Sequence, residues 1–595
     1  MPTAWCGRCL ECEAVLTART QHETIGYIVG VRGVEESEMK INHLKYIPLA
    51  NFSSVYGTKL TDTELQKTLA RVDCQQALVI LSRLASIHIA ICEHNDDAAH
   101  LMQHLRELHT AHIYTRGGNP ITYMRFEGIT SPQSIFILEK WVLNYCSIEK
   151  EFRAITVADV MCVMDALLAI NDRLPSDIDG HETEYLYLTL YYNTHRVIKN
   201  QIARSFYVFS VLSREEPEMT DLLNGYVQKR GFSIEERLTV LFNQLGSVIP
   251  QFTNEEIFSH HIFTKAAEFD ARELFPVYDR IMEDICDDYK RTRRRAKKTL
   301  DKVWDFELFY RYPFIRIGDV RLSLSETAVV YQMWDGLYWS VRFAFEHGDK
   351  TFMIRFGRPF ERYVQIITEA ATKESNGRSV FQGEFFYKYE GDLKASTDCY
   401  FRIGNTLFAV EAKAKSPQSS TLTGVDRAAI EEEMHELMIA PISQALSRLK
   451  EITSDSCDVC SDIKNIFEGV EQTVIFSVSM EKVQPIGELL FELDAALKPD
   501  LNGTNVVAYH NINIEEYEFI CNLLETCPSE LTKILVDWFT DQRKDVRSAV
   551  ALANFLSDCG KPCTCSQYVS SLFKECMRDI SLKTFGKDMT TELSF

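Results

Sequence analysis

Two acidic residues and a lysine near position 400 have the types and spacing of a cation site. Asp398 is followed by Gly404-Asn405, which is typical of a two-residue hairpin loop, and then by Glu411-Ala-Lys413. If positions 403 and 406 pair across that loop, Asp398 lies directly opposite Glu411. Cross-strand neighbours lie roughly 4.5 to 5.5 Å apart at Cβ, and two like charges so placed repel each other unless a positive group lies between them. The spacing therefore predicts a site for a divalent cation.

The second half of this hairpin, residues 406–415, alternates as a β-strand should. One face carries Leu407 and Ala409, and then Glu411, Lys413 and Lys415, whereas the other face is apolar throughout. A face that changes from apolar to charged indicates the edge of a cleft. Because Glu411 and Lys413 point the same way, a carboxylate that can hold a metal ion would share one place with an ammonium that can orient a water molecule or offset phosphate charge.

Two amphipathic segments flank the hairpin in sequence. A helix is predicted to begin at Phe356 and to carry Glu361, because apolar residues follow at helical spacing. A second helix is predicted over residues 441–450, where Gln444 and Arg448 lie four residues apart on a face away from the apolar stripe. The hairpin would therefore lie between two helices that each bring polar groups to it.

The ordered set of a helix with Glu361, a hairpin with Asp398, a Glu411-Ala-Lys413 strand and a helix with Gln444 resembles the PD-(D/E)XK nuclease superfamily. The resemblance covers residues from about 350 to 525. One position departs from the commonest form of the family, because Thr397 rather than proline precedes Asp398. The resemblance implies an α/β nuclease core with a mixed central sheet flanked by helices, joined here to a large, mainly α-helical N-terminal region in a multidomain chain.

The resemblance also implies an activity, the metal-dependent hydrolysis of phosphodiester bonds in DNA or RNA, with endonuclease action favoured over exonuclease action. Mg²⁺, which Mn²⁺ could replace, would be held by Asp398, Glu411 and the backbone carbonyl of Ala412, and Glu361 would assist a second ion. Lys413 would position the attacking water and Gln444 would orient substrate or water. Phosphates of the nucleic acid, DNA before RNA, would be contacted by basic residues near the site: Lys388, Lys394, Arg402, Lys415, Arg427 and Arg448.

Plainer interpretations of the same residues stay open. Glu411 and Lys413 could be a solvated pair on an edge strand, and Asp398 could be a turn residue. Glu361 could be an acid in the first turn of a helix, where it favours the positive end of the dipole, and Gln444 could belong to an ordinary polar face. The alternative function is a catalytically silent sensor or scaffold that keeps the nuclease fold and binds nucleic acid or protein.

The bulk composition limits the class of protein. A chain of 595 residues should contain more than one domain. Its hydrophobic content of 46% and charged content of 25% are ordinary for a globular protein. No apolar run reaches the roughly 20 residues that span a bilayer, and no export signal precedes the first helices, so we expect a cytoplasmic protein without membrane contact. The net charge of −21 means that nucleic acid would need a local basic groove.

The densest basic run is Lys290–Lys298, and it follows an acidic stretch at residues 283–288. Two interpretations are open. The run could be a helix that contacts phosphates, or it could be the solvated face of a linker helix whose charges pair with those acids. The second interpretation is favoured.

The 17 cysteines are scattered, and most are expected to be free thiols. A structural zinc site would need two close pairs of ligands, which Cys457 and Cys460 with two of Cys559, Cys563 and Cys565 could supply. Unrelated thiols are the favoured interpretation. A third cluster at positions 6, 9 and 12 has no obvious fourth ligand, although His22 follows.

Four regions are predicted along the chain: a mainly helical sensing or regulatory region at 1–300, a β-rich connector at 301–349, the nuclease-like domain at 350–525 and a helical tail at 526–595. The helical region is where a protein partner or a second copy of the chain would bind. A triggered role, such as defence against foreign nucleic acid, follows by analogy alone. Helices are expected at Thr63–Ile91, Pro132–Tyr145, Val157–Ile170, Glu184–Leu212, Ile234–Leu245 and Val329–Phe345, and strands at Thr24–Arg32, Phe309–Leu322, Thr473–Ser479 and Asn505–Tyr509.

Overall fold

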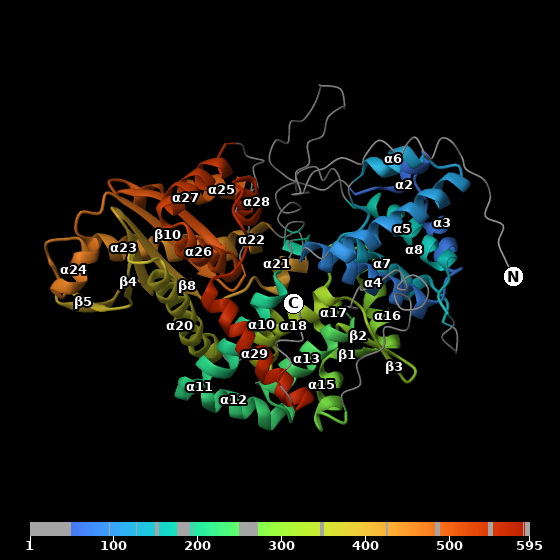
Figure 1. Cartoon of the computed structure of the whole chain (residues 1–595), viewed down its shortest axis with the longest axis horizontal. Coiled ribbons are helices and arrows are strands. Elements are labelled where there is room, and N and C mark those ends of the chain that lie inside the picture. Colours follow the sequence, from blue (N-terminus) through green and yellow to red (C-terminus); the bar gives the residue numbers. More distant parts are fainter. Residues whose placement is uncertain are drawn as a thin grey trace.

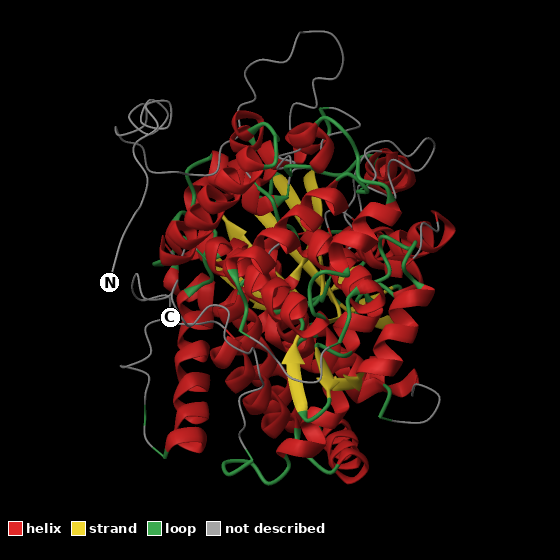
Figure 2. Ribbon diagram, turned by 90° about the vertical axis from the view of Figure 1, so that its right-hand side faces the viewer, coloured by secondary structure: helices red, strands yellow, loops and turns green. Residues whose placement is uncertain are grey.

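The computed structural model describes residues 49–588 apart from 94–95, 127, 149–153, 175–187, 189–190, 194–195, 249–271, 345–349, 424–426, 482–487, 545–550 and 587. Over these residues the protein is a mixed α/β structure in which helices surround three small sheets (Figure 2). The strand predicted at Thr24–Arg32 and the cysteines at positions 6, 9 and 12 lie outside the described residues.

The first part of the chain is helical, as expected, and its helices gather on the right of Figure 1. They are α2 (Phe52–Tyr56), α3 (Asp62–Leu69), α4 (Cys74–Cys92), α5 (Asp96–Thr115), α6 (Pro120–Arg125), α7 (Pro132–Tyr145) and α8 (Val157–Asn171). The helices predicted at 132–145 and 157–170 are confirmed, because Ser131 and Thr156 cap their first turns. The segment predicted as one helix at 63–91 is two helices, because the Asp73 side chain accepts the Gln75 amide at 2.8 Å and starts a new one.

Helix α4 is the one described helix that is long and apolar enough to cross a membrane by length and composition. Most of it is buried inside the protein, where residues such as Leu78 and Leu81 are fully covered by neighbouring helices. The same length and composition are found in the core helices of globular proteins, and this burial accounts for its apolar character.

The middle of the chain links the helices to the largest sheet. It comprises α10 (Ile198–Phe206), a π-helical turn η1 (Tyr207–Leu212), α11 (Ser213–Glu215), α12 (Pro217–Arg230), α13 (Ile234–Val248), α15 (Tyr278–Ile285), α16 (Tyr289–Lys298), α17 (Glu307–Arg311), α18 (Glu326–Met333) and α19 (Asp335–Arg342). A small sheet of β1 (Cys286–Asp288), β2 (Phe314–Ile317) and β3 (Val320–Ser323) lies among them.

Two predictions in this part need correction. The strand run expected from Phe309 begins only at Phe314, because residues 307–311 form α17. The Gly318-Asp319 turn between the two strands is confirmed, since Ile317 pairs with Val320 across it. The helix expected at 329–345 is two helices, which break at Trp334, and its last residue lies outside the described residues.

The largest sheet has five strands in the order β11-β10-β8-β7-β4. Its strands are β4 (Ser379–Gly383), β7 (Cys399–Ile403), β8 (Thr406–Lys413), β10 (Gln472–Ser479) and β11 (Val506–Asn513). Strands β4, β7 and β8 form an antiparallel meander, while β8, β10 and β11 run parallel. The sheet is therefore mixed, and both strands predicted after residue 470 are confirmed within a few residues at their ends.

The two faces of this sheet belong to two different hydrophobic cores. Leu407 and Ala409 pack in one core with α23 (Ala440–Ile452), whereas Phe408 and Val410 pack in the other with α20 (Lys350–Glu374). The predicted alternation of β8 is confirmed by this division. The first core continues into helices α2 to α8, and the second continues into α10 and the C-terminal helices. The boundaries between the four predicted regions stay a prediction.

Helix α20 is longer than the sequence predicted. It begins at Lys350 rather than Phe356, and it passes through Gly357 and Pro359. Proline is favoured in the first turn of a helix, so the Gly-Arg-Pro sequence reads as a start signal. Phe352 and Phe356 are fully buried and stack at 5.6 Å between ring centres, and this packing offsets the proline and extends the helix by more than one turn.

The remaining elements cover the sheet and its edges (Figure 1). A three-stranded sheet, β6-β5-β9, adjoins the meander. The helices and strands of this part are β5 (Phe386–Tyr389), β6 (Asp392–Ala395), α21 (Ser419–Thr423), α22 (Arg427–Met434), η2 (His435–Ile439), β9 (Cys457–Asp458), α24 (Ser461–Phe467), α25 (Glu488–Leu501), α26 (Ile514–Thr526), α27 (Pro528–Gln542), α28 (Leu552–Asp558) and α29 (Gln567–Phe585). The helical tail predicted after residue 526 is confirmed, and α29 packs along α10.

Glu139 on α7 is a fully buried acid, and neither of its carboxyl oxygens forms a hydrogen bond with a described residue. Burial raises the pKa of Glu139 well above its usual value. Below about pH 4.5 the side chain is protonated in both the folded and the unfolded chain, so it has no effect on how stability changes with pH. As the pH rises, the unfolded chain loses this proton and the folded chain keeps it, so stability falls by about 1.4 kcal/mol per pH unit until the folded pKa is reached.

The substitution Glu139→Gln should therefore stabilise the protein progressively from pH 5 upward and change little at lower pH. Thermal unfolding of the variant and the wild type across this range measures the difference. Glu283→Gln, at an exposed position of α15, is the matched control and should not reproduce the trend. A constant difference between Glu139→Gln and the wild type at all pH values would contradict the assignment.

Candidate active site

The β7–β8 hairpin places the predicted acids at one end of the central strands. Ile403 pairs with Thr406 and Cys399 pairs with Val410, so the predicted register is confirmed. Gly404 takes the positive φ of 57° that the tight loop requires. Counting outward by one more pair puts Asp398, just before β7, opposite Glu411 on β8.

Asp398 is buried beside the strand that carries Glu411. Its Oδ2 accepts the Ala412 amide at 2.6 Å, and its own carbonyl accepts Nε2 of Gln365 from α20 at 3.0 Å. Burial raises the pKa of Asp398 well above its usual value, and the charges of Glu411 and Glu361 raise it further, against the Ala412 amide and Lys413. The amide and carbonyl of one residue in an antiparallel ladder face the same neighbouring strand, so the Ala412 carbonyl also faces Asp398.

Glu411 is held by two cations from different elements. Its Oε1 accepts Nζ of Lys413 at 2.8 Å, and its Oε2 accepts a guanidinium nitrogen of Arg448 at 2.9 Å. Lys413 also donates to Oε1 of Gln444 at 3.3 Å. Gln444 and Arg448 both come from α23, so the predicted spacing of four residues on one helix face is confirmed. Glu411 is only 3% exposed in its side chain, whereas Lys413 is 34% exposed and open to an incoming group.

Glu361 reaches the same place from α20. Burial raises its pKa, and the charges of Glu384 and Glu411 raise it further while Lys413 opposes them. The charged groups of the hairpin and the two helices therefore act on one another. They are the carboxylates of Asp398, Glu411 and Glu361 and the cations of Lys413 and Arg448. Of the set predicted from sequence, Lys413 is hydrogen-bonded to both Glu411 and Gln444, and Asp398 is bonded to the Ala412 amide next to Glu411. Glu361 acts on these residues through its charge.

Glu384 is a further acid at this site that the sequence pattern did not reveal. Partial burial raises the pKa of Glu384. The charge of Arg448 lowers this pKa, and the charge of Glu411 raises it further. Gly383 pairs with Cys399, so the next residue, Glu384, lies opposite Asp398. The same counting that located Glu411 would have located Glu384, but only if β4 had been recognised as a strand.

The residues present fit Mg²⁺ in the chemistry of their donor atoms. Asp398, Glu411 and the Ala412 carbonyl offer oxygen, and Mg²⁺ needs only one or two carboxylates because it keeps several water molecules. Among the described residues, no three side chains of His, Cys, Asp or Glu are already grouped closely enough to hold a metal ion. A cation would therefore bind through few protein ligands and would compete with Lys413 and Arg448 for Glu411.

The other basic residues predicted to contact phosphate are mostly engaged with the protein. Three of them pair with carboxylates: Lys394 with Glu451, Lys415 with Glu436, and Arg427 with Glu431 and Glu492. Arg402 donates to the carbonyls of residues 404, 465, 466 and 468 at the loop end of the hairpin, away from Glu411. Lys388 is exposed on β5. Of the six, Arg448 is the residue that contacts an acid of the site.

The cysteines behave as expected in the part of the chain that the structure describes. Their thiols are free, and Cys74 and Cys146 are buried among apolar residues. Cys457 is buried in β9, while Cys460 is exposed and Cys563 donates to the Ala553 carbonyl at 3.2 Å. Among these residues, no three Cys or His side chains lie close enough together to hold a zinc ion.

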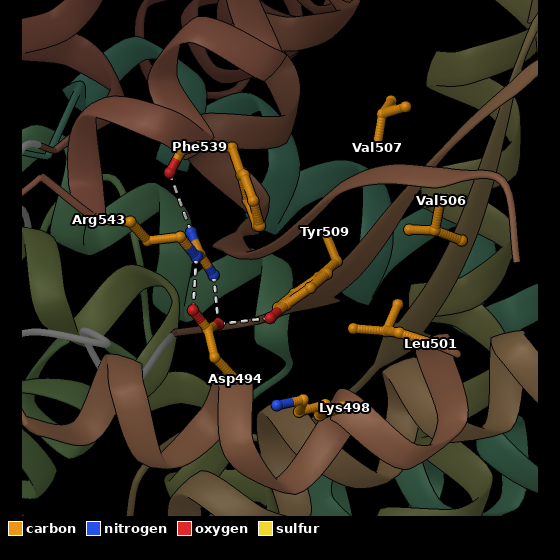
Figure 3. A pocket seen from close by; sticks show the side chains of 8 residues that line it. All are labelled: Asp494, Lys498, Leu501, Val506, Val507, Tyr509, Phe539 and Arg543. Carbon is orange, nitrogen blue, oxygen red and sulfur yellow. Dashed lines mark hydrogen bonds and ion pairs between the residues drawn. The ribbon is translucent and has the colours of Figure 1, made fainter. Parts of the chain in front are cut away.

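A surface pocket of about 280 Å³ lies elsewhere, between α25, β11 and α27 (Figure 3). Asp494 in this pocket accepts two hydrogen bonds from Arg543, at 2.7 and 2.8 Å, and a third from Tyr509. The ring of Phe539 lies 3.4 Å from the Arg543 guanidinium carbon. These contacts join β11 to its two helices, and none of the predicted site residues lines the pocket.

Comparison of the chain with protein-family models, with curated proteins and with solved structures gives no match in any of the three. The function of the site therefore has to be argued from its own geometry.

Proposed function

We propose that this protein is a metal-dependent nuclease that hydrolyses phosphodiester bonds of DNA or RNA at the cluster of Asp398, Glu411, Lys413, Glu361 and Gln444. The observation that supports this most directly is the convergence of a buried carboxyl pair and an accessible ammonium at the end of one hairpin. A structural ion pair would need one acid and one base. Here several acids are crowded together at an electrostatic cost, which is the pattern expected where function requires them.

Each side chain has a distinct role in the proposed reaction. Asp398, Glu411 and the Ala412 carbonyl would hold Mg²⁺, which when bound lowers the pKa of water and polarises the phosphate. Lys413 would orient the attacking water and offset the charge that develops on the phosphoryl oxygens. Its hydrogen bond to Gln444 would fix the direction of the ammonium, so Gln444 acts on the water through Lys413. Glu361 would assist a second ion.

Arg448 gives a reason to consider the second candidate function, a silent nuclease fold. With both of its carboxylate oxygens accepting charged donors, Glu411 is neutralised without any metal ion. A scaffold that binds nucleic acid or protein without cutting would need nothing more. The two functions differ in whether a divalent cation displaces Arg448 or Lys413 from Glu411.

Titration calorimetry with Mg²⁺ and Mn²⁺ tests the proposal. The wild type should bind the cation, and Asp398→Asn should weaken binding by about tenfold or more, because one of few protein ligands loses its charge. Asp392→Asn, an exposed acid on β6, is the control and should bind like the wild type. Cleavage is then measured on single-stranded DNA, duplex DNA and RNA. If the wild type binds neither cation and cuts none of these substrates, the silent fold is the correct assignment.

A cytoplasmic location, a triggered role in defence and a protein partner or second copy bound through the helical region belong to the same proposal. They rest on the resemblance to the PD-(D/E)XK superfamily and on the large helical region beside the site. A nuclease that is active among its own nucleic acids would need such control.

A further inference from the structure

Helix α16 is a basic element in an acidic protein. Seven of its ten residues are lysine or arginine and none is acidic, although the whole chain has a net charge of −21. The acids expected to neutralise it do so only in part. Asp287 pairs with Arg291 and Arg295, and Arg293 donates to the Asn144 carbonyl. The interpretation of the run as a helix paired to its preceding acids therefore holds for two of the seven cations, and a third, Arg293, is held by a backbone carbonyl.

The other four cations form one exposed stripe. Lys290, Arg294, Lys297 and Lys298 are exposed, and their side chains pair with no residue in the part of the chain that the structure describes. Positions 290, 294, 297 and 298 recur at the spacing of a single helix face. At about 1.5 Å per residue the stripe is about 12 Å long. Duplex nucleic acid carries a negative charge for every ~1.7 Å of its axis, so the stripe matches several phosphates.

The helix that carries the stripe is firmly held. Thr292 and Ala296 are buried against the protein, and the Tyr289 hydroxyl donates to the Leu143 carbonyl on α7. At the far end, the buried Lys140 donates to the carbonyls of Thr299 and Lys302 at 2.9 and 2.8 Å. The stripe is therefore presented on a rigid element, and its binding would need no ordering of the backbone.

The chemistry of this surface favours a phosphate backbone over a lipid surface. A helix that lies on a membrane buries large apolar side chains in the lipid beside its charged residues. The outer face of α16 carries no large exposed apolar residue. It also offers no exposed aromatic ring on which a base could stack. Contacts would be limited to phosphates, which gives binding that is independent of sequence and sensitive to salt.

We propose that Lys290, Arg294, Lys297 and Lys298 form a nucleic-acid exosite that binds the sugar-phosphate backbone of duplex DNA or RNA. The exosite lies apart from the candidate active site, because α16 and the pair β8 and α20 are on opposite sides of the protein in Figure 1. It shares with the proposed function only the identity of the ligand, and binding here does not depend on hydrolysis. Its role would be to raise the affinity of an acidic protein for a long polyanion.

Binding of a fluorescent 30-base-pair duplex to the full chain in EDTA tests this. Replacing the four residues together, Lys290→Gln, Arg294→Gln, Lys297→Gln and Lys298→Gln, should lower the affinity by about tenfold or more at ~0.1 M salt. The slope of log K against log salt concentration should become shallower by about 3 to 4, because each phosphate contact contributes about 0.9. A charge-matched control, Lys59→Gln, Lys67→Gln, Lys533→Gln and Lys574→Gln, changes exposed lysines elsewhere and should keep the wild-type slope.

The outcomes separate this proposal from the nuclease assignment. The exosite would be overturned if the stripe variant and the control lost the same affinity, or if the stripe variant kept the wild-type salt slope. It would also be overturned if the wild-type protein bound vesicles with 30% phosphatidylserine and did not bind the duplex. Lys413→Ala removes one phosphate donor but leaves α16 intact, so its salt slope should become shallower by no more than about 1, against about 3 to 4 for the stripe variant. Loss of cleavage with retained binding therefore concerns the candidate active site, and loss of salt-dependent binding with retained cleavage of a short single strand supports the exosite.

Discussion

Replacing Lys413 by alanine is expected to leave the protein folded and to lower the rate of DNA or RNA cleavage in Mg²⁺ by roughly 100-fold to 10,000-fold. The ammonium is the one group of the site that is both partly exposed and hydrogen-bonded to Glu411 and Gln444, at 2.8 and 3.3 Å. Its removal takes away the donor that we propose for the phosphate. Glu411 would keep Arg448 as a counterion, so the loss should cost little stability.

Three measurements make this prediction specific. Single-turnover cleavage gives the rate, and circular dichroism gives the fold. Calorimetry gives the affinity for Mg²⁺, which Lys413→Ala should retain or increase, because its three oxygen donors are unchanged and one competitor for Glu411 is removed. Lys373→Ala, which removes an exposed lysine paired with Glu369 at the end of α20, is the control and should cleave normally. Wild-type cleavage by Lys413→Ala would end the assignment of this residue to the reaction.

The part of the site that the sequence predicted is the part determined by local geometry. A glycine with positive φ in a two-residue loop fixes the register of β7 on β8, and the alternation of Leu407 to Lys413 fixes which side chains share a face. Gln444 and Arg448 could be paired because a helix turn separates them by a known angle. In each case the relevant residues are linked by a few peptide units of regular structure.

The part that the sequence did not predict depends on contacts between distant segments. Glu384 joins the site through the pairing of β4 with β7, and the segment 379–383 has too few strand-forming residues to be recognised alone. The true start of α20 depends on aromatic packing by Phe352 and Phe356, which outweighs the local preference at Pro359. The partial neutralisation of α16 likewise depends on which of its arginines reach Asp287.

Substituting Arg204 by methionine is expected to lower the free energy of unfolding by about 3 to 5 kcal/mol, the largest stability effect we foresee from a single charged residue. Arg204 on α10 is 1% exposed and donates to Oε1 of Glu518 on α26 at 2.7 Å. The Tyr363 hydroxyl of α20 donates to the same oxygen at 2.6 Å. Burial already raises the pKa of Glu518 against the opposing charge of Arg204, so loss of the arginine would leave a buried acid without its counterion.

The double substitution Arg204→Met, Glu518→Met provides the control for this argument. It removes both charges and should recover most of the stability lost in Arg204→Met, because an apolar pair in a closed site can replace a buried ion pair at little cost. Chemical denaturation of the three proteins at pH 7 measures the difference. Equal destabilisation by the double variant would mean that packing of Arg204 on the Trp334 ring, 4.8 Å away, rather than charge, is what matters.

The double variant, Arg204→Met with Glu518→Met, also tests how α20 is held in place. Tyr363 lies two residues after Glu361 on this helix, so its hydrogen bond to Glu518 helps to fix the depth at which Glu361 enters the candidate site. The double variant loses that hydrogen bond while it regains stability. We therefore expect it to fold but to cleave more slowly than the wild type, with an intact affinity for Mg²⁺ at Asp398 and Glu411. Cleavage at the wild-type rate would show that α20 is positioned by its apolar contacts alone.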